Sequence, residues 1–202
     1  MKTAQSALDE LCEGNRRFVA KLNDSATAST PVSNALVEEH APAAIIVGCA
    51  DARVPVETIF DQSLGQLFVV RVAGNVVTDT QMGSVEFAAT KFGAPLAVVL
   101  GHSECGAVAA TLNALKEPGS QFSPGLQAVV DAVSPAVESV VDANSTVDEL
   151  MPQAVRANIA VAVDRLKHGS EVLSDLIAQG KFQVVGAEYS LHTGQVEFFD
   201  DM

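Results

Sequence analysis

Apolar residues near the start of the chain repeat with helical spacing. Within residues 4–22 they are separated by three, four or seven positions, which places them on one face of a helix. These positions are Ala4, Leu8, Leu11, Phe18 and Leu22. Residues 23–33 are polar and rich in turn-forming types, so we expect a connector that runs over the surface.

The middle and the end of the chain alternate continuous apolar runs with helical patterns. The runs predict buried strands at 43–48, 66–72, 95–100 and 182–188, and a terminal hairpin strand at 194–199. Helices are predicted at 55–60, 80–92, 105–115 and 125–179. The helix at 80–92 is expected to turn Val85, Phe87, Ala88 and Phe92 inward, and the last region to be interrupted near Pro135, at 143–146 and at Gly169.

Apolar strands that alternate with helices are typical of a parallel sheet covered on both faces. We therefore predict an α/β fold with a mostly parallel central sheet of four strands plus an edge strand. A chain of 202 residues fits one domain. Residues 1–202 are interpreted as that domain, with an N-terminal helix and arm at 1–34 and an α/β core at 35–202.

Composition narrows the partners and the location of the protein. A hydrophobic content of 48% with mean hydropathy +0.25 suggests apolar surface that another subunit covers. The net charge of −13 argues against nucleic acid or an anionic membrane as partner, since both require a basic face. No apolar signal core or membrane-length run is present, and three cysteines do not make a disulfide framework. We expect a cytoplasmic protein.

Two short motifs follow the strands predicted at 43–48 and 95–100. The first is Cys-Ala-Asp-Ala-Arg at 49–53, and the second is His-Ser-Glu-Cys at 102–105. Ligands of open parallel sheets bind at the carboxyl ends of strands, so these side chains are expected to meet. Two thiolates and an imidazole form a Cys₂His zinc set with one position open, the pattern of catalytic sites. Cys105 also lies at a predicted helix N-terminus, which favours its thiolate.

Together these motifs identify a family resemblance. Cys-x-Asp-x-Arg, followed about fifty residues later by Gly-His-x-x-Cys-Gly, resembles the β-class carbonic anhydrases. The likeness extends to Phe60-Asp61, to the run LFVVRVAGN at 67–75, to the run GSVEF at 83–87 and to Val185-Gly186-Ala187. The resemblance covers nearly the whole chain.

The resemblance implies a zinc enzyme with one Zn²⁺ per chain, held by Cys49, His102 and Cys105. The implied reaction is the reversible hydration of CO₂ to bicarbonate and a proton, by attack of zinc-bound hydroxide on CO₂. It also implies that the N-terminal helix and arm pack on a partner subunit in a homodimer or homotetramer. Because two thiolates already satisfy the charge of the metal, we predict activity that rises toward alkaline pH.

Asp51 and Arg53 lie two residues apart on the first motif, and two roles are open for them. Asp51 can accept a hydrogen bond from the metal-bound nucleophile while Arg53 holds it off the metal. Alternatively, Asp51 can bind zinc as the fourth ligand, which gives a closed and inactive site. Family members of both kinds are known, and the sequence is compatible with either.

The resemblance further implies a small apolar pocket for CO₂. Phe68, Ala73 and Phe87 occupy positions that line this pocket in relatives, across a dimer interface, although both phenylalanines could also be plain core. The backbone N–H of Gly106 could bind a developing carboxylate oxygen. Relatives often carry a glutamine nine residues before the first ligand; this chain has His40 there, which could donate a hydrogen bond or be an exposed loop residue.

Two other functions fit the same residues. Relatives of this fold hydrolyse CS₂ or COS, and small changes in the pocket could give that activity. A non-catalytic, zinc-stabilised scaffold is also possible if Asp51 fills the fourth position. The expected partners are small-molecule substrates, CO₂ and bicarbonate for the implied reaction, with no nucleic acid and no membrane.

Overall fold

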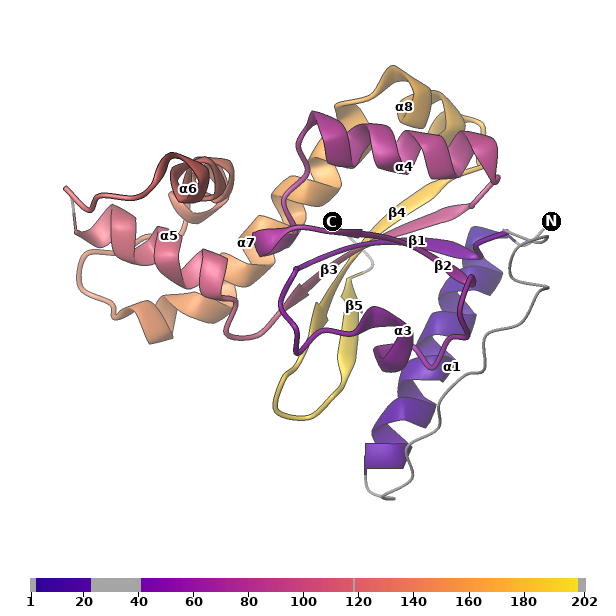
Figure 1. The fold of residues 1–202 in the computed structure, drawn as a ribbon, viewed down its shortest axis with the longest axis horizontal. Helices are drawn as coiled ribbons and strands as arrows, with labels where there is room; N and C mark the ends of the chain where they lie inside the picture. Colours follow the sequence, from indigo (N-terminus) through magenta and orange to yellow (C-terminus); the bar gives the residue numbers. More distant parts are fainter. Residues whose placement is uncertain (1–2, 23–40, 118, 200–202) are drawn as a thin grey trace.

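A five-stranded sheet lies at the centre of the part of the chain that the structure describes (Figure 1). This computed structural model describes residues 3–22, 41–117 and 119–199. The strands are β1 (Ala44–Gly48), β2 (Leu67–Arg71), β3 (Leu96–His102), β4 (Gln183–Tyr189) and β5 (Val196–Phe199). They are ordered β2-β1-β3-β4-β5, and all neighbours are parallel except β4 and β5. The predicted sheet of four parallel strands with an edge strand is confirmed.

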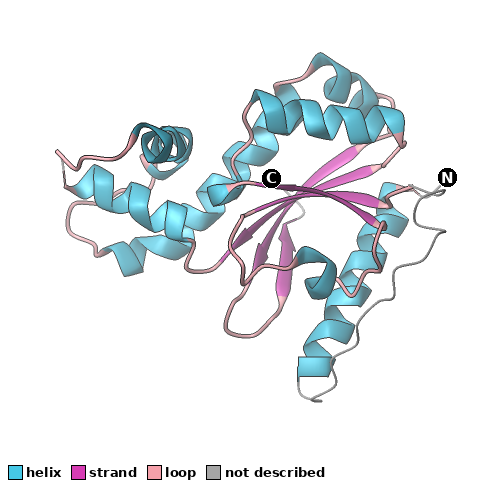
Figure 2. Ribbon diagram, viewed as in Figure 1, coloured by secondary structure: helices cyan, strands magenta, loops and turns pink. Residues whose placement is uncertain are grey.

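Helices cover both faces of this sheet (Figure 2). The helical segments are α1 (Ala4–Leu22), α3 (Val56–Ile59), the short 3₁₀ turn η1 (Ala73–Asn75), α4 (Asp79–Lys91), α5 (Gly106–Lys116), α6 (Pro124–Val137), α7 (Val147–His168) and α8 (Glu171–Ala178). In Figure 1, α4, α7 and α8 lie on one side of the sheet and α1 and α3 on the other, while α5 and α6 extend beyond the carboxyl end of β3. None of the helices described is long and apolar enough to span a membrane.

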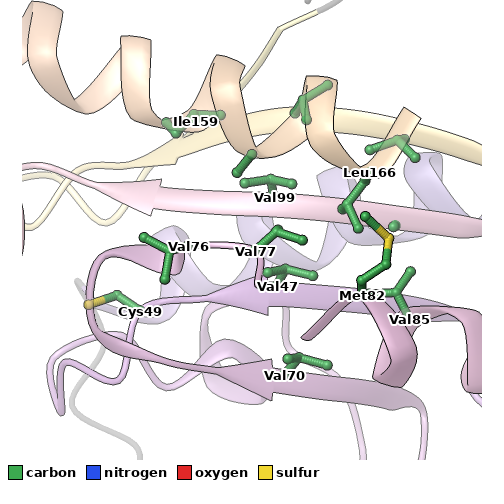
Figure 3. Packing of buried hydrophobic residues seen from close by; sticks show 14 of the residues in the cluster. Val47, Cys49, Val70, Val76, Val77, Met82, Val85, Val99, Ile159 and Leu166 are labelled. Atoms are coloured by element: carbon green, nitrogen blue, oxygen red, sulfur yellow. The ribbon is translucent and has the colours of Figure 1, made fainter. Parts of the chain in front are cut away.

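The core consists of two apolar clusters, one on each face of the sheet. All five residues of β1 and all seven of β3 are buried, because helices cover both faces of these central strands. Val47, Val70 and Val99 project from three neighbouring strands toward α4 and α7 (Figure 3). On the opposite face, Ala7 and Leu11 of α1 pack against β1 and α3. The apolar runs of the sequence therefore fix the sheet, and the sheet fixes where each strand ends.

Local hydrogen bonds account for several helix starts. Thr146 caps α7 in a reciprocal arrangement with Glu149, which satisfies N–H groups that no helical carbonyl can reach. Ser170 caps α8 by accepting a hydrogen bond from Leu173 N at 3.1 Å. The predicted breaks at 143–146 and Gly169 are thus confirmed as the connections before and after α7.

One local expectation is confirmed and one was wrong. The helical region is interrupted near Pro135, as predicted: α6 includes the proline and ends at Val137, and the Ser134 hydroxyl donates to Val130 O at 2.8 Å beside the proline. Phe87 does not point into the core of its own chain, since 50% of it is exposed. Two residues along a helix correspond to a rotation of about 200°, so the same helix cannot bury both Val85 and Phe87 on one face.

Candidate metal centre

The two sequence motifs meet at the carboxyl ends of β1 and β3. These strands are neighbours, with Gly48 opposite Leu100, so Cys49 follows β1 beside the last residue of β3, His102. The chain passes from β1 outward to β2 and then returns to β3 on the other side of β1. The motifs therefore lie where the strand order reverses, the place where open α/β sheets bind ligands.

Cys49, His102 and Cys105 form a compact group of possible metal ligands. Their ligand atoms all lie within 4.8 Å of one another, and all three residues are buried. His102 Nδ1 lies 2.9 Å from the carbonyl oxygen of Ser103, which accepts from it when Nδ1 carries the proton. The other ring nitrogen, Nε2, is buried and has no hydrogen-bond partner among the described residues. Two thiols and an unpartnered imidazole nitrogen in one buried group fit a Zn²⁺ ion.

The environment of the two cysteines favours ionisation of one of them. The pKa of Cys49 is lowered, chiefly because the Cys105 thiol hydrogen-bonds to its sulfur. The pKa of Cys105 is raised for the same reason, and burial adds to the effect. Cys105 is the N-cap of α5, and the nearby backbone N–H groups of Val108 and Ala107 act to lower its pKa, although its side chain accepts no capping hydrogen bond. These donors, together with the charge of a bound metal, are what a second thiolate needs.

Asp51 is held by Arg53 in a two-point contact. Arg53 Nε donates to Asp51 Oδ1 at 3.0 Å, and its terminal nitrogen donates to Oδ2 at 2.7 Å. The backbone N–H of Arg53 also donates to Oδ1, at 2.9 Å. The Arg53 guanidinium holds the pKa of the Asp51 carboxyl well below its usual range. Asp51 is therefore an ionised acceptor, and it is absent from the group of candidate metal ligands in this structure.

Contacts from β2 and η1 hold the first motif in place. Arg71 Nε donates to Cys49 O at 2.8 Å, and the same guanidinium donates to Asp51 O. The backbone N–H of Gly74 lies 3.4 Å from Cys49 Sγ and donates to it. Arg71 and Gly74 lie outside the two ligand motifs, so the motifs alone predict no role for them at this site.

The β4–β5 hairpin holds the second motif. Ser103 N donates to Tyr189 O at 3.0 Å, and Leu191 N donates to Ser103 Oγ at 2.9 Å. His192 Nε2 lies 2.6 Å from a carboxylate oxygen of Glu104. Glu104 has φ 56°, a strained value for a residue other than glycine, and it stands between the two candidate ligands of this motif. The contact of His192 was not expected from the sequence.

The predicted pocket residues are only partly brought together. Phe68 on β2 and Phe87 on α4 lie with ring centroids 6.4 Å apart, and Phe92 contacts both. Ala73 begins η1 next to Gly74, and Gly106 is an exposed first residue of α5 with open space where a side chain would be. His40 lies outside the described residues. Phe68 packs against the apolar cluster that contains Cys49 and Cys105, whereas Phe87 is half exposed.

The family of the chain follows from its similarity to known proteins. Residues 44–196 match the family model for carbonic anhydrase. The chain is 40% identical to carbonic anhydrase 2 of Mycobacterium tuberculosis over 198 residues, which cover 96% of this chain and 92% of that protein. A β-carbonic anhydrase of Coccomyxa, solved in complex with acetazolamide, has TM-score 0.73 and 25% identity, with coverage of 95% and 86%. A tetrameric β-carbonic anhydrase of Sordaria macrospora has TM-score 0.70 and 20% identity, with coverage of 82% and 84%.

The chain therefore belongs to the β-carbonic anhydrases, a family of zinc enzymes. Membership implies hydration of CO₂ as the activity. The resemblance inferred from the two motifs is confirmed.

Proposed function

We propose that this chain hydrates CO₂ reversibly to bicarbonate and a proton, with one Zn²⁺ held by Cys49, His102 and Cys105. The observation that carries the proposal is the buried group of three donors, in which His102 Nε2 has no other partner among the described residues. When bound, zinc acidifies a water molecule and thereby supplies the nucleophile. Two thiolates neutralise much of the metal charge, so activity is expected to rise toward alkaline pH.

In this proposal Asp51 accepts a hydrogen bond at the site, and Arg53 holds Asp51 in position. The ionised Asp51 can only accept hydrogen bonds, which suits it to orient the proton of the nucleophile. The fork from Arg53 occupies both carboxylate oxygens and draws Asp51 away from the metal group, which supports the open form of the site. For the closed form, Asp51 would have to give up these contacts and the hydrogen bond from Arg53 N.

The substrate pocket is proposed to be completed by a second copy of the chain. Phe68, Ala73, Phe87 and Gly106 are the pocket candidates. An exposed phenylalanine beside β2, an edge strand of the sheet, is a surface that a second subunit can cover. The Sordaria relative is described as tetrameric. A dimer is the smallest assembly that supplies pocket residues from two chains, and a tetramer built from such dimers would contain the same pocket.

Sedimentation of a Phe87→Lys variant tests the assembly. A lysine at this position would place a charge in the proposed interface, so the variant is expected to sediment as a smaller species and to lose activity. Leu126→Lys, which changes a similarly exposed apolar residue on α6, is the matched control. A Phe87→Lys variant with wild-type sedimentation would contradict the shared pocket.

Stopped-flow CO₂ hydration by zinc-quantified protein, from neutral to alkaline pH, tests the activity. Asp51→Asn keeps the shape but replaces an acceptor oxygen, and kcat/KM is expected to fall by roughly 10²–10⁴, the range of a positioned acid–base group. Asp9→Asn, on an exposed face of α1 where Asp9 accepts from Gln5, is the control and is expected to retain activity. If the protein turns over COS but not CO₂, the proposed substrate is wrong and COS takes its place. No turnover of either with full zinc, and loss of metal in Asp51→Ala, would indicate a scaffold.

A further inference from the structure

One buried amide outside the ligand motifs is connected to the metal group. Asn158 lies on α7 and is only 3% exposed. Its side-chain Nδ2 donates to the carbonyl oxygen of Gly74 at 2.7 Å, across 84 positions of sequence. The N–H of the same Gly74 donates to Cys49 Sγ. A single residue of η1 thus joins α7 to the sulfur of a candidate ligand.

Gly74 needs such a holder because its own backbone preference does not fix it. It has φ 72°, a conformation that glycine adopts freely but other residues rarely do. A Cβ here would lie 3.1 Å from Ala107 Cβ and 3.2 Å from Val133 Cγ2, so a side chain is also disfavoured by space. A glycine can rotate its peptide planes at little cost, and the direction of its N–H must therefore come from its contacts. The bond from Asn158 holds the peptide plane on the carbonyl side of Gly74, and this anchors the residue whose N–H, in the preceding plane, reaches Cys49.

Gly101, which directly precedes the second motif, explains how α7 comes close enough to reach Gly74. A Cβ on Gly101 would lie 2.6 Å from both Cδ1 and Cγ1 of Ile159, closer than any side chain could accept. Ile159 follows Asn158 directly on α7 and lies over the sheet near the carboxyl end of β3 (Figure 3). The missing side chain at Gly101, immediately before the ligand His102, therefore lets α7 approach and brings Asn158 within reach of Gly74.

An N–H···S hydrogen bond has two effects on a metal-binding thiolate. It stabilises negative charge on the sulfur, and it fixes the direction of the sulfur lone pairs toward the metal. Partners of this kind, one contact removed from a metal, commonly change its affinity by about 10–100-fold when they are removed. The series of hydrogen bonds from Asn158 to Gly74 and from Gly74 to Cys49 is buried, and its last donor points toward the ligand sulfur, as support of a metal-binding thiolate requires.

We propose that Asn158 is a positioning residue for the ligand Cys49, acting through the Gly74 backbone on the sulfur that binds the metal. The proposal rests on the proposed metal site and goes beyond the ligand set. Asn158 touches neither the metal nor the substrate. Its effect is to keep the Gly74 N–H directed at Cys49 Sγ and so to tune the thiolate.

Metal affinity and the spectrum of the cobalt-substituted protein test the proposal. In Asn158→Leu, which keeps the size of the side chain but cannot donate, zinc affinity in a competitive chelator titration is expected to fall by about 10–100-fold. The thiolate-to-cobalt charge-transfer band is expected to move to longer wavelength, because the sulfur loses a stabilising donor. The matched control is Val163→Ala, a buried residue of the same helix without a role at the site, which should lower stability but leave the band unchanged.

The outcomes separate the inference from the proposed function. If the wild type shows no thiolate-to-cobalt band, both the metal site and the role of Asn158 are wrong. If the wild type shows the band but Asn158→Leu has the band position and zinc affinity of Val163→Ala, only the role of Asn158 is wrong. Should Asn158→Leu fail to fold, Asn158→Ser serves in its place, since its shorter hydroxyl cannot span the distance to Gly74 O, and the same two results decide.

Discussion

Asn15 links three segments that are far apart in the sequence, and its removal gives a quantitative test of the fold. This residue of α1 is 6% exposed. Its Nδ2 donates to Ile59 O at 3.1 Å and to Gly194 O at 3.0 Å, and its Oδ1 accepts from Val196 N at 2.9 Å. The side chain thereby ties α1 to α3 and to the β4–β5 hairpin, which in turn holds the second ligand motif.

The cost of Asn15→Ala follows from these three hydrogen bonds. At a net value of about 1 kcal/mol each, their loss amounts to about 3 kcal/mol. The cost would be higher if three backbone groups stayed unsatisfied, but Asn15 borders a surface pocket of about 300 Å³ that water can enter. For a chain of this size, 1 kcal/mol lowers Tm by roughly 2–4 °C, so the expected loss is about 6–12 °C. Asn15→Asp should cost at least as much at neutral pH, since a carboxylate oxygen would face two carbonyl oxygens.

Urea unfolding of all variants at one fixed protein concentration measures this loss, because the concentration-dependent contribution from assembly is then the same in each comparison. Gln5→Ala is the control, because Gln5 on the same helix makes one exposed hydrogen bond, to Asp9 at 2.9 Å, and its removal should change stability by less than about 0.5 kcal/mol. If Asn15→Ala is no less stable than Gln5→Ala, the three contacts do not support the fold as argued. Well below Tm, Asn15→Ala should retain its activity, since no metal ligand is changed.

Acid stability and metal removal give two further tests. Hydrogen bonds from Lys21 and Arg17 lower the pKa of Asp61, so its contribution is present above the unfolded pKa of about 3.9 and is lost as pH falls through the folded pKa. Asp61→Asn should therefore be less stable than wild type at pH 7, by under about 1 kcal/mol because the ion pairs with Arg17 and Lys21 are exposed. In strong acid the two proteins should be equally stable, and a difference that persists there would refute the linkage. Zinc at about 100 times its Kd should stabilise the metal-free protein by about 2.7 kcal/mol, an increment that His102→Ala loses and His168→Ala retains in thermal unfolding. If zinc stabilises both variants equally, the metal does not bind at His102.

The sheet and the ligand group could be predicted because their signals are local. The buried runs around Ile46 and Val98 define β1 and β3, and a parallel sheet brings their carboxyl ends to one edge. The three candidate ligands follow directly from these strand ends. The packing of the N-terminal arm on a partner, the boundary between arm and core at residue 34, and a cytoplasmic location stay predictions.

The supporting contacts could not be predicted because their partners are distant in sequence. Asn158 is a polar residue on a helix, and nothing in its neighbourhood indicates that Gly74 lies against it. The pairing of His192 with Glu104 likewise depends on where the hairpin folds back. Phe87 was misplaced for a different reason: its apolar character suggested the core, whereas helical rotation relative to Val85 turns it outward. An exposed aromatic residue of this kind is a signal for an interface rather than for packing.

The register of β1 on β3 and the geometry of the metal group depend on each other. Gly48 lies opposite Leu100, and this pairing brings Cys49 to within 4.8 Å of the ligand atom of His102. A slip of one residue would displace the two strands by about 3.3 Å and turn every side chain of β1 to the opposite face. Such a slip would break the ligand group, and it would also exchange the residues that the two apolar clusters require. The packing that makes the slip unfavourable therefore also holds the two halves of the ligand set together, before any metal binds.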